Sequence, residues 1–177
     1  KVLGGDIREI DAADLLEQVG LAQGEPFLIC GGPPCQPFST AGKRLGINDH
    51  RGSLFMDFIR MIDYIRPRFF IMENVKGIIS APLKHTPLAE RDKNDPEQHL
   101  GTVLDVILSE FNKLGYKTVY GVLDAVNYGV PQFRERFVLI GSRDNEDIFL
   151  PFPTHFQMHQ DPKYRWRTLS NTIRDLE

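Results

Sequence analysis

Apolar residues gather in four short segments along the chain, each bounded by glycine, proline or charged residues. The segments cover residues 27–30, 69–72, 118–123 and 136–140. Short apolar runs with such boundaries are typical of strands buried in a sheet. The pattern therefore predicts four strands.

Apolar residues at helical spacing predict helices over residues 11–19, 53–65 and 100–111. Asp11 is a candidate N-cap, and Gly20 and Gly115 are expected to end the first and third helices. The predicted inward-facing side chains are those of Phe55, Phe58, Ile59, Ile62 and Ile65 in the second helix and Val103, Ile107 and Phe111 in the third.

The alternation of strands and helices predicts an α/β fold with a parallel or mixed sheet covered by helices on both faces. A length of 177 residues amounts to one domain. Residues 36–52 contain glycines without a hydrophobic period, and loops of this length are usually functional. Residues 84–98 are polar and charged and are predicted to form a surface loop.

Composition narrows the class of protein without identifying it. The hydrophobic and charged fractions, 41% and 25%, are ordinary for a globular protein. No apolar run approaches the about 20 residues of a membrane span. Two cysteines form at most one disulfide, which favours an intracellular location. The five histidines show no metal-binding pattern, so no metal is expected. The net charge of −3 is unusual for a chain that binds nucleic acid strongly. If the protein binds nucleic acid, we expect most phosphate contacts to come from outside these 177 residues.

Chemically useful residues stand at the ends of the predicted strands. Cys35 follows the first strand through a glycine- and proline-rich turn, whereas Cys30 lies inside that strand and is predicted to be core. Glu73 and Asn74 end the second apolar run, and residues 132–136 open the last. Polar groups at the carboxyl ends of parallel strands are where α/β proteins place their sites.

These residues resemble the Pro-Cys, Glu-Asn-Val and Gln-x-Arg-x-Arg motifs of the cytosine-C5 DNA methyltransferases. The motif residues are 34–39, 73–75 and 132–136, and further similarity covers residues 51–55, 127–132, 151–155 and 168–176. The resemblance extends over nearly the whole chain, except for an insertion-like stretch at about residues 82–98. It implies a Rossmann-like, S-adenosylmethionine-dependent methyltransferase fold.

The resemblance also implies that residues 1–177 are a partial catalytic domain. The family's glycine-rich donor turn and its mid-sheet first strand would precede Lys1, and its target-recognition domain would follow Glu177. A sheet without that strand leaves neighbouring backbone groups unpaired. A polypeptide of these residues alone is therefore expected to be inactive and prone to aggregate.

By resemblance, Cys35 is the nucleophile that attacks C6 of a flipped-out cytosine. Glu73 would contact N3 and the exocyclic amine of the base, and Arg136 would contact O2 and orient Glu73. Asn74 would hold the Pro-Cys loop, and Arg134 would support the surroundings of the cysteine. We expect Cys35, Glu73 and Arg136 to converge at the carboxyl ends of adjacent strands.

The same resemblance assigns binding residues. S-adenosyl-L-methionine would contact Asp6, Ile7, Pro34 and Leu54. The DNA-facing loop would contain Gln36, Ser39, Lys43, Arg44 and Arg51. Its side chains would contact phosphates and fill the space that the flipped base leaves in the duplex. The implied partner is double-stranded DNA. We also expect a companion restriction endonuclease and a complete enzyme that is monomeric. The expected location is the bacterial cytoplasm or otherwise inside the cell.

Three alternatives stay open at this point. The same chemistry could act on RNA, as in tRNA methyltransferases with nearly the same motifs. A non-catalytic nucleic-acid-binding relative would have lost Cys35, Glu73 or Arg136, but all three are present. A cysteine hydrolase needs a histidine partner, and no histidine occupies a motif-like strand end. Taken singly, Cys35 fits a structural cysteine and Arg134 a solvated surface residue.

Overall fold

The computed structural model describes residues 4–34, 53–83 and 92–174. Its α-helices are α1 (Ala12–Val19), α2 (Ser53–Ile65), α3 (Thr102–Lys113) and the short α4 (Leu169–Ile173). Short 3-10 helices are η1 (Lys76–Ser80), η3 (Pro96–Gln98), η4 (Ala125–Tyr128) and η5 (Pro162–Tyr164). The helix predicted over residues 53–65 has the predicted bounds, and α3 begins two residues later than predicted.

Four strands form one mixed sheet in the order β1-β2-β4-β3. Their bounds are β1 (Leu28–Gly31), β2 (Phe69–Val75), β3 (Lys117–Asp124) and β4 (Glu135–Ser142). β1 and β2 are parallel, whereas β4 runs antiparallel to both of its neighbours. The predicted α/β fold with a mixed sheet is confirmed.

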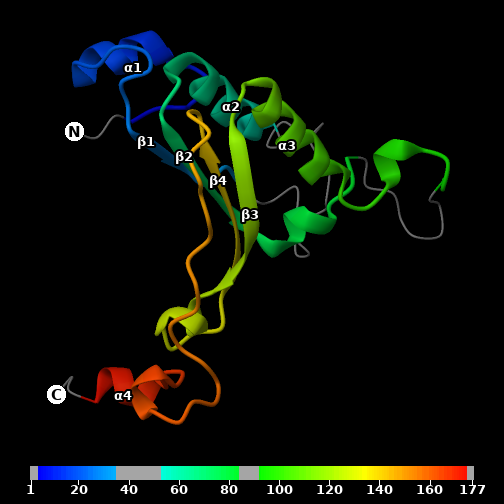
Figure 1. Ribbon diagram of the computed structural model, residues 1–177. Helices are drawn as coiled ribbons and strands as arrows, with labels where there is room; N and C mark the ends of the chain where they lie inside the picture. The colour runs from blue at the N-terminus through cyan, green and yellow to red at the C-terminus, as the bar shows by residue number, and fades with distance from the viewer. Residues whose placement is uncertain (1–3, 35–52, 84–91, 175–177) are drawn as a thin grey trace.

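One face of the sheet is covered by α2 and α3 (Figure 1). Alternate residues of β2 point into this layer, and Phe70 and Met72 are completely buried there. Phe70 stacks on Phe111 of α3 with ring centroids 4.1 Å apart. The small α1 packs against α2 beside β1. The predicted inward-facing residues of α2 and α3 are all buried.

The opposite face carries no helix within the described part of the chain, so the predicted second helical layer is not seen there. Ile71 on β2 and Val138 and Ile140 on β4 are only half-buried on this side. Cys30 also points to this face and is exposed, so its prediction as a core residue is wrong. Its strand is apolar, but only one side of that strand is covered.

Two further predictions need correction. β2 extends to Val75, so Glu73 lies within the strand rather than after it. The predicted surface loop over residues 84–98 contains η3, where Gln98 is buried and its amide donates to Asp95. The predicted caps of α1 are confirmed, since Asp11 accepts from Ala13 N and Gly20 adopts a left-handed conformation.

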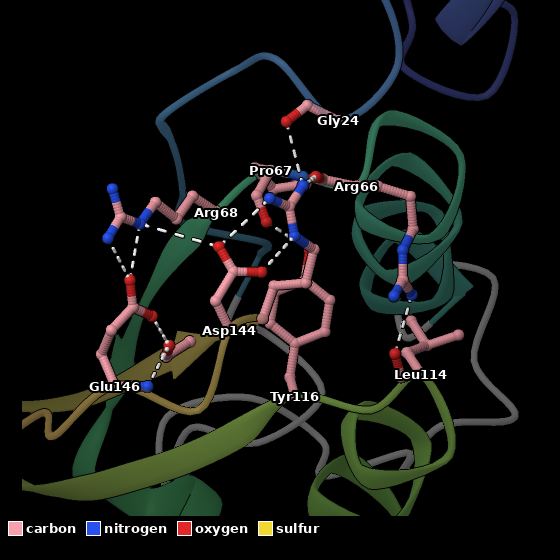
Figure 2. Close-up of polar contacts among 10 residues, drawn as sticks. Gly24, Arg66, Pro67, Arg68, Leu114, Tyr116, Asp144 and Glu146 are labelled. Carbon is pink, nitrogen blue, oxygen red and sulfur yellow. Dashed lines mark hydrogen bonds and ion pairs between the residues drawn. The ribbon is translucent and has the colours of Figure 1, made fainter.

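A polar cluster fastens the end of the sheet remote from Glu73 (Figure 2). Arg143, after β4, donates to the carbonyls of Gly24 and Arg66 at 2.9 and 2.5 Å. The Tyr116 hydroxyl donates to the Pro67 carbonyl at 2.6 Å. Burial raises the pKa of Tyr116 to about 12, against the opposing effect of nearby Arg66 and Arg143. The cluster joins the α2–β2 turn to the start of β3 and the end of β4.

Candidate active site

An ion pair between Glu73 and Arg136 marks the other end of the sheet. In the antiparallel register, Val75 lies opposite Arg136 and Glu73 opposite Val138, so the two charged residues are diagonal neighbours on the open face. Arg136 Nε lies 2.6 Å from Glu73 Oε1. The Glu73 side chain is 48% exposed and that of Arg136 is 27% exposed. The arginine thus fixes one carboxylate oxygen, and the side chain of Glu73 stays accessible.

Asn74 points to the covered face and reaches the segment that leads to Cys35. It is 2% exposed, its Nδ2 donates to the Pro33 carbonyl at 3.2 Å, and its Oδ1 accepts from Val75 N at 2.8 Å. A buried amide bonded through both of its ends gives the Pro33 backbone a fixed anchor.

Gly32, the residue before Pro33, places the segment that leads to Cys35 beside the Glu73 carboxylate. A Cβ placed on Gly32 would lie 3.4 Å from Glu73 Oε2. Glu73 and Asn74 therefore border the approach to the Pro-Cys turn from the two faces of one strand. Cys35 itself lies outside the described residues.

The predicted convergence at strand carboxyl ends is wrong for Arg136. Glu73 is near the carboxyl end of β2, but Arg136 is the second residue of β4 and lies at its amino end. The two still meet because β4 is antiparallel to β2. The site is therefore built at one end of the sheet from strands of opposite direction.

Arg134 is held by its backbone just before β4. Its N–H donates to Asp124 Oδ1 at 2.8 Å, and its carbonyl accepts from Ala125 N at 3.2 Å. Its guanidinium makes no hydrogen bond or ion pair with the described residues and is exposed. Sequence reasoning did not single out Asp124, although its position as the N-cap of η4 is a recognisable signal.

The structure describes all four residues predicted to contact the methyl donor, which are Asp6, Ile7, Pro34 and Leu54. Asp6 forms an ion pair with Arg8, and Ile7 is fastened by Arg60 of α2, whose Nη2 donates to the Ile7 carbonyl at 2.8 Å. Pro34 is exposed, and Leu54 is half-buried in the first turn of α2. Arg60 is a second residue that sequence reasoning missed, because its partners are backbone carbonyls that carry no side-chain signature.

The chain matches one protein family over its whole length. The family model described as C-5 cytosine-specific DNA methylase matches residues 1–177. The chain belongs to this family. The Glu73–Arg136 pair and the segment leading to Cys35 are thus features of a C-5 cytosine methylase sequence.

Curated relatives support the same family. The chain is 38% identical over 160 residues to the Type II methyltransferase M.AquIA of Picosynechococcus sp., covering 90% of this chain and 60% of that protein. It is 38% identical over 180 residues to M.FnuDI of Fusobacterium nucleatum, covering all of this chain and 43% of that protein. The chain thus spans about half the length of these relatives.

Solved structures support the fold. A structure titled as a prophage-encoded DNA modification methyltransferase of E. coli superposes with a TM-score of 0.62 at 22% identity, covering 98% of this chain and 41% of that chain. The shared methyltransferase fold agrees with the Rossmann-like α/β architecture.

Several methylase motif positions fall outside the described residues, and these are Cys35, Gln36, Ser39, Lys43, Arg44 and Arg51. Within the described ranges, no group of three or more His, Cys, Asp or Glu side chains is arranged to hold a metal ion. In the same ranges, no helix is long and apolar enough to cross a membrane.

Proposed function

We propose that the protein containing this chain transfers a methyl group from S-adenosylmethionine to C5 of cytosine in double-stranded DNA. The observation that supports this most directly is the Glu73–Arg136 ion pair beside the segment leading to Cys35. A carboxylate oriented by a cation, next to the segment that leads to a cysteine, suits activation of a pyrimidine ring for addition of a thiolate.

The proposed reaction begins with a cytosine flipped out of the duplex. The Cys35 thiolate forms a carbon–sulfur bond at C6 while Glu73 holds N3 and the exocyclic amine. C5 becomes nucleophilic and takes the methyl group that the bound donor supplies. A base then removes the C5 proton, the carbon–sulfur bond breaks, and the thiolate leaves. Arg136 holds Glu73 and contacts the base O2.

The remaining assignments belong to the same proposal. The Asp6 carboxylate can accept from the donor's adenine amine, and Arg60 keeps the neighbouring Ile7 backbone in place. Pro34 and Leu54 would line the same pocket. The DNA would lie along the loop that contains Gln36, Ser39, Lys43, Arg44 and Arg51. The segment of 177 residues alone is proposed to be inactive.

The proposed biological setting rests on the relatives. The names of the curated relatives describe Type II methyltransferases. We therefore propose an intracellular modification enzyme that is monomeric when complete and is accompanied by a restriction endonuclease.

Covalent trapping tests the reaction. Duplex DNA carrying 5-fluorocytosine should form an adduct with the full protein that survives denaturation, because fluorine cannot leave as a proton. Cys35→Ala should abolish the adduct, and Glu73→Gln should slow its formation by about 10²-fold or more.

The other cysteine of the chain, Cys30, provides a matched control. Cys30→Ala should leave trapping unchanged, since Cys30 lies exposed on the open face of the sheet. An adduct that persists in Cys35→Ala, or disappears in Cys30→Ala, would contradict the assignment. Trapping of fluorocytosine-containing tRNA but not of DNA would replace the proposed substrate by RNA.

A further inference from the structure

Asn127 joins two segments of the chain that are distant in sequence. It belongs to η4, and its side-chain Oδ1 accepts a hydrogen bond from Trp166 Nε1 at 3.0 Å. Its backbone carbonyl accepts from the N–H groups of both Thr154 and His155 at 2.9 Å. Figure 1 shows the orange-to-red C-terminal segment passing the yellow turn that follows β3. The Thr154 hydroxyl donates to the same Asn127 carbonyl at 3.4 Å. Asn127 thus binds the C-terminal segment, residues 154–166, through four hydrogen bonds.

Trp166 also contacts the far end of the loop that Asn127 begins. Its ring meets Phe133 edge to face, with centroids 5.3 Å apart and planes at 86°. The indole therefore bridges residues 127 and 133. Between them, Gly129 has a φ of +86° and lies against the His155 ring, so close that a Cβ would be 2.8 Å from His155 Cε1. The C-terminal segment holds this loop at its start, its middle and its end.

The loop over residues 127–133 leads directly to Arg134 and Arg136. Its base is closed where Arg134 N donates to Asp124 Oδ1 and Ala125 N donates to the Arg134 carbonyl. Phe133 is adjacent to Arg134, and Arg136 follows two residues later, paired with Glu73. A shift of the loop therefore acts on the backbone of Arg134 and, through it, on the start of β4, from which Arg136 extends.

We propose that Asn127 is a positioning residue for the methyl-transfer site. Its amide oxygen fixes Trp166, and Trp166 in turn sets the loop over residues 127–133 and hence the placement of Arg134 and Arg136. Trp166 is half-buried, and its indole N–H can only donate. Removing the acceptor leaves that donor without its partner and releases the indole from the start of the loop, while the bonds of Thr154 and His155 to the Asn127 carbonyl remain. The catalytic part of this inference rests on the proposed function.

We call the contacts of Asn127 and Phe133 with Trp166 the clamp. Three variants of the full protein test it. Asn127→Leu removes the acceptor at similar size, Asn127→Asp keeps an acceptor, and Trp166→Phe keeps the ring but removes the N–H. The rate of fluorocytosine trapping at saturating DNA should fall about tenfold in Asn127→Leu and Trp166→Phe. It should stay within about threefold of the parent in Asn127→Asp. The KM for S-adenosylmethionine should stay within about twofold in all three, because the donor residues lie elsewhere.

Fluorescence follows the clamp independently of activity. Trp166 is the one tryptophan of this sequence, and subtracting the spectrum of a matched Trp166→Phe variant isolates its emission from any in the rest of the protein. In Asn127→Leu this emission should move to longer wavelength and become more accessible to acrylamide. In Asn127→Asp it should not.

A double-mutant cycle separates a shared mechanism from two independent losses. Asn127→Leu/Trp166→Phe should trap DNA no more slowly than the slower single variant. Multiplying losses, or a full trapping rate in Asn127→Leu with Trp166 released, would overturn the inference. If the parent protein does not trap DNA at all, the proposed function fails, whereas the emission of Trp166 still tests the clamp.

Discussion

The two faces of the sheet differ although the same strands make both. On the face under α2 and α3, Phe70, Met72, Phe137 and Leu139 are 0% exposed. On the other face, Ile71, Val138 and Ile140 are half-buried, and Leu28 is 42% exposed. The first face is a close-packed core, and the second is apolar but carries the charged pair at its end.

The difference shows how one strand contributes both to the packed core and to the candidate site. Successive residues of a strand point to opposite faces. Asn74 consequently turns into the covered layer, where it is buried and anchors Pro33, while Glu73 turns to the open side and meets Arg136. The buried side of β2 thus anchors the segment that passes the candidate site on its open side.

Truncation at neighbouring positions of β2 gives the largest contrast. Phe70→Ala should lower the free energy of unfolding by about 3–5 kcal/mol, because it removes the ring stacked on Phe111 from a packed layer. Ile71→Ala should cost about 1 kcal/mol, because its side chain is half-buried. Urea unfolding of the two variants measures both values.

The contrast fails if Ile71→Ala costs as much as Phe70→Ala. That result would mean that the open face is covered in the protein by residues outside those described. Equal small losses at both positions would instead show that the layer under α2 and α3 is not packed as described.

Local signals in the sequence predicted local structure well. The apolar spacing of α2 gave its bounds and its buried residues, and Asp11 and Gly20 gave the ends of α1. The direction of β4 and the exposure of Cys30 depend on which segments lie alongside, and one strand's pattern does not contain that information. The site residue Arg136 was therefore expected at the wrong end of its strand.

The candidate site divides in the same way. The residues with reactive or charged groups, Glu73, Asn74 and Arg136, could be named from motifs. The contacts that Arg60 and Asp124 make with backbone groups were not predicted, because their partners are carbonyls and N–H groups brought near by folding. Such contacts follow from the assembled sheet and its connections.

Adding a methyl group to each face gives a smaller contrast. A Cβ on Gly141 would lie 2.0 Å from the Phe70 ring, inside the packed layer, so Gly141→Ala should cost about 1–3 kcal/mol. A Cβ on Gly121 would meet only Leu150 Cδ1, at 2.5 Å, on the open side. Because that side-chain end can move away, Gly121→Ala should cost about 0.5 kcal/mol or less. Thermal unfolding of the two variants compares them, and a larger loss at Gly121 would reverse the ranking of the faces.

The smallest effect concerns Tyr116, which packs edge to face on Phe70 within the covered layer. Its hydroxyl donates to Pro67, so Tyr116→Phe should cost about 1 kcal/mol at neutral pH. Burial raises the pKa of Tyr116 from 10 to about 12. A raised pKa stabilises the folded state fully below pH 10, and that contribution is lost as the pH rises from 10 towards 12. Unfolding measured across this window should show a decline in stability that is shallower in Tyr116→Phe than in Tyr120→Phe. Tyr120 serves as the control because it is 44% exposed. An equally steep decline in both variants would show that the covered layer does not shield Tyr116 from titration.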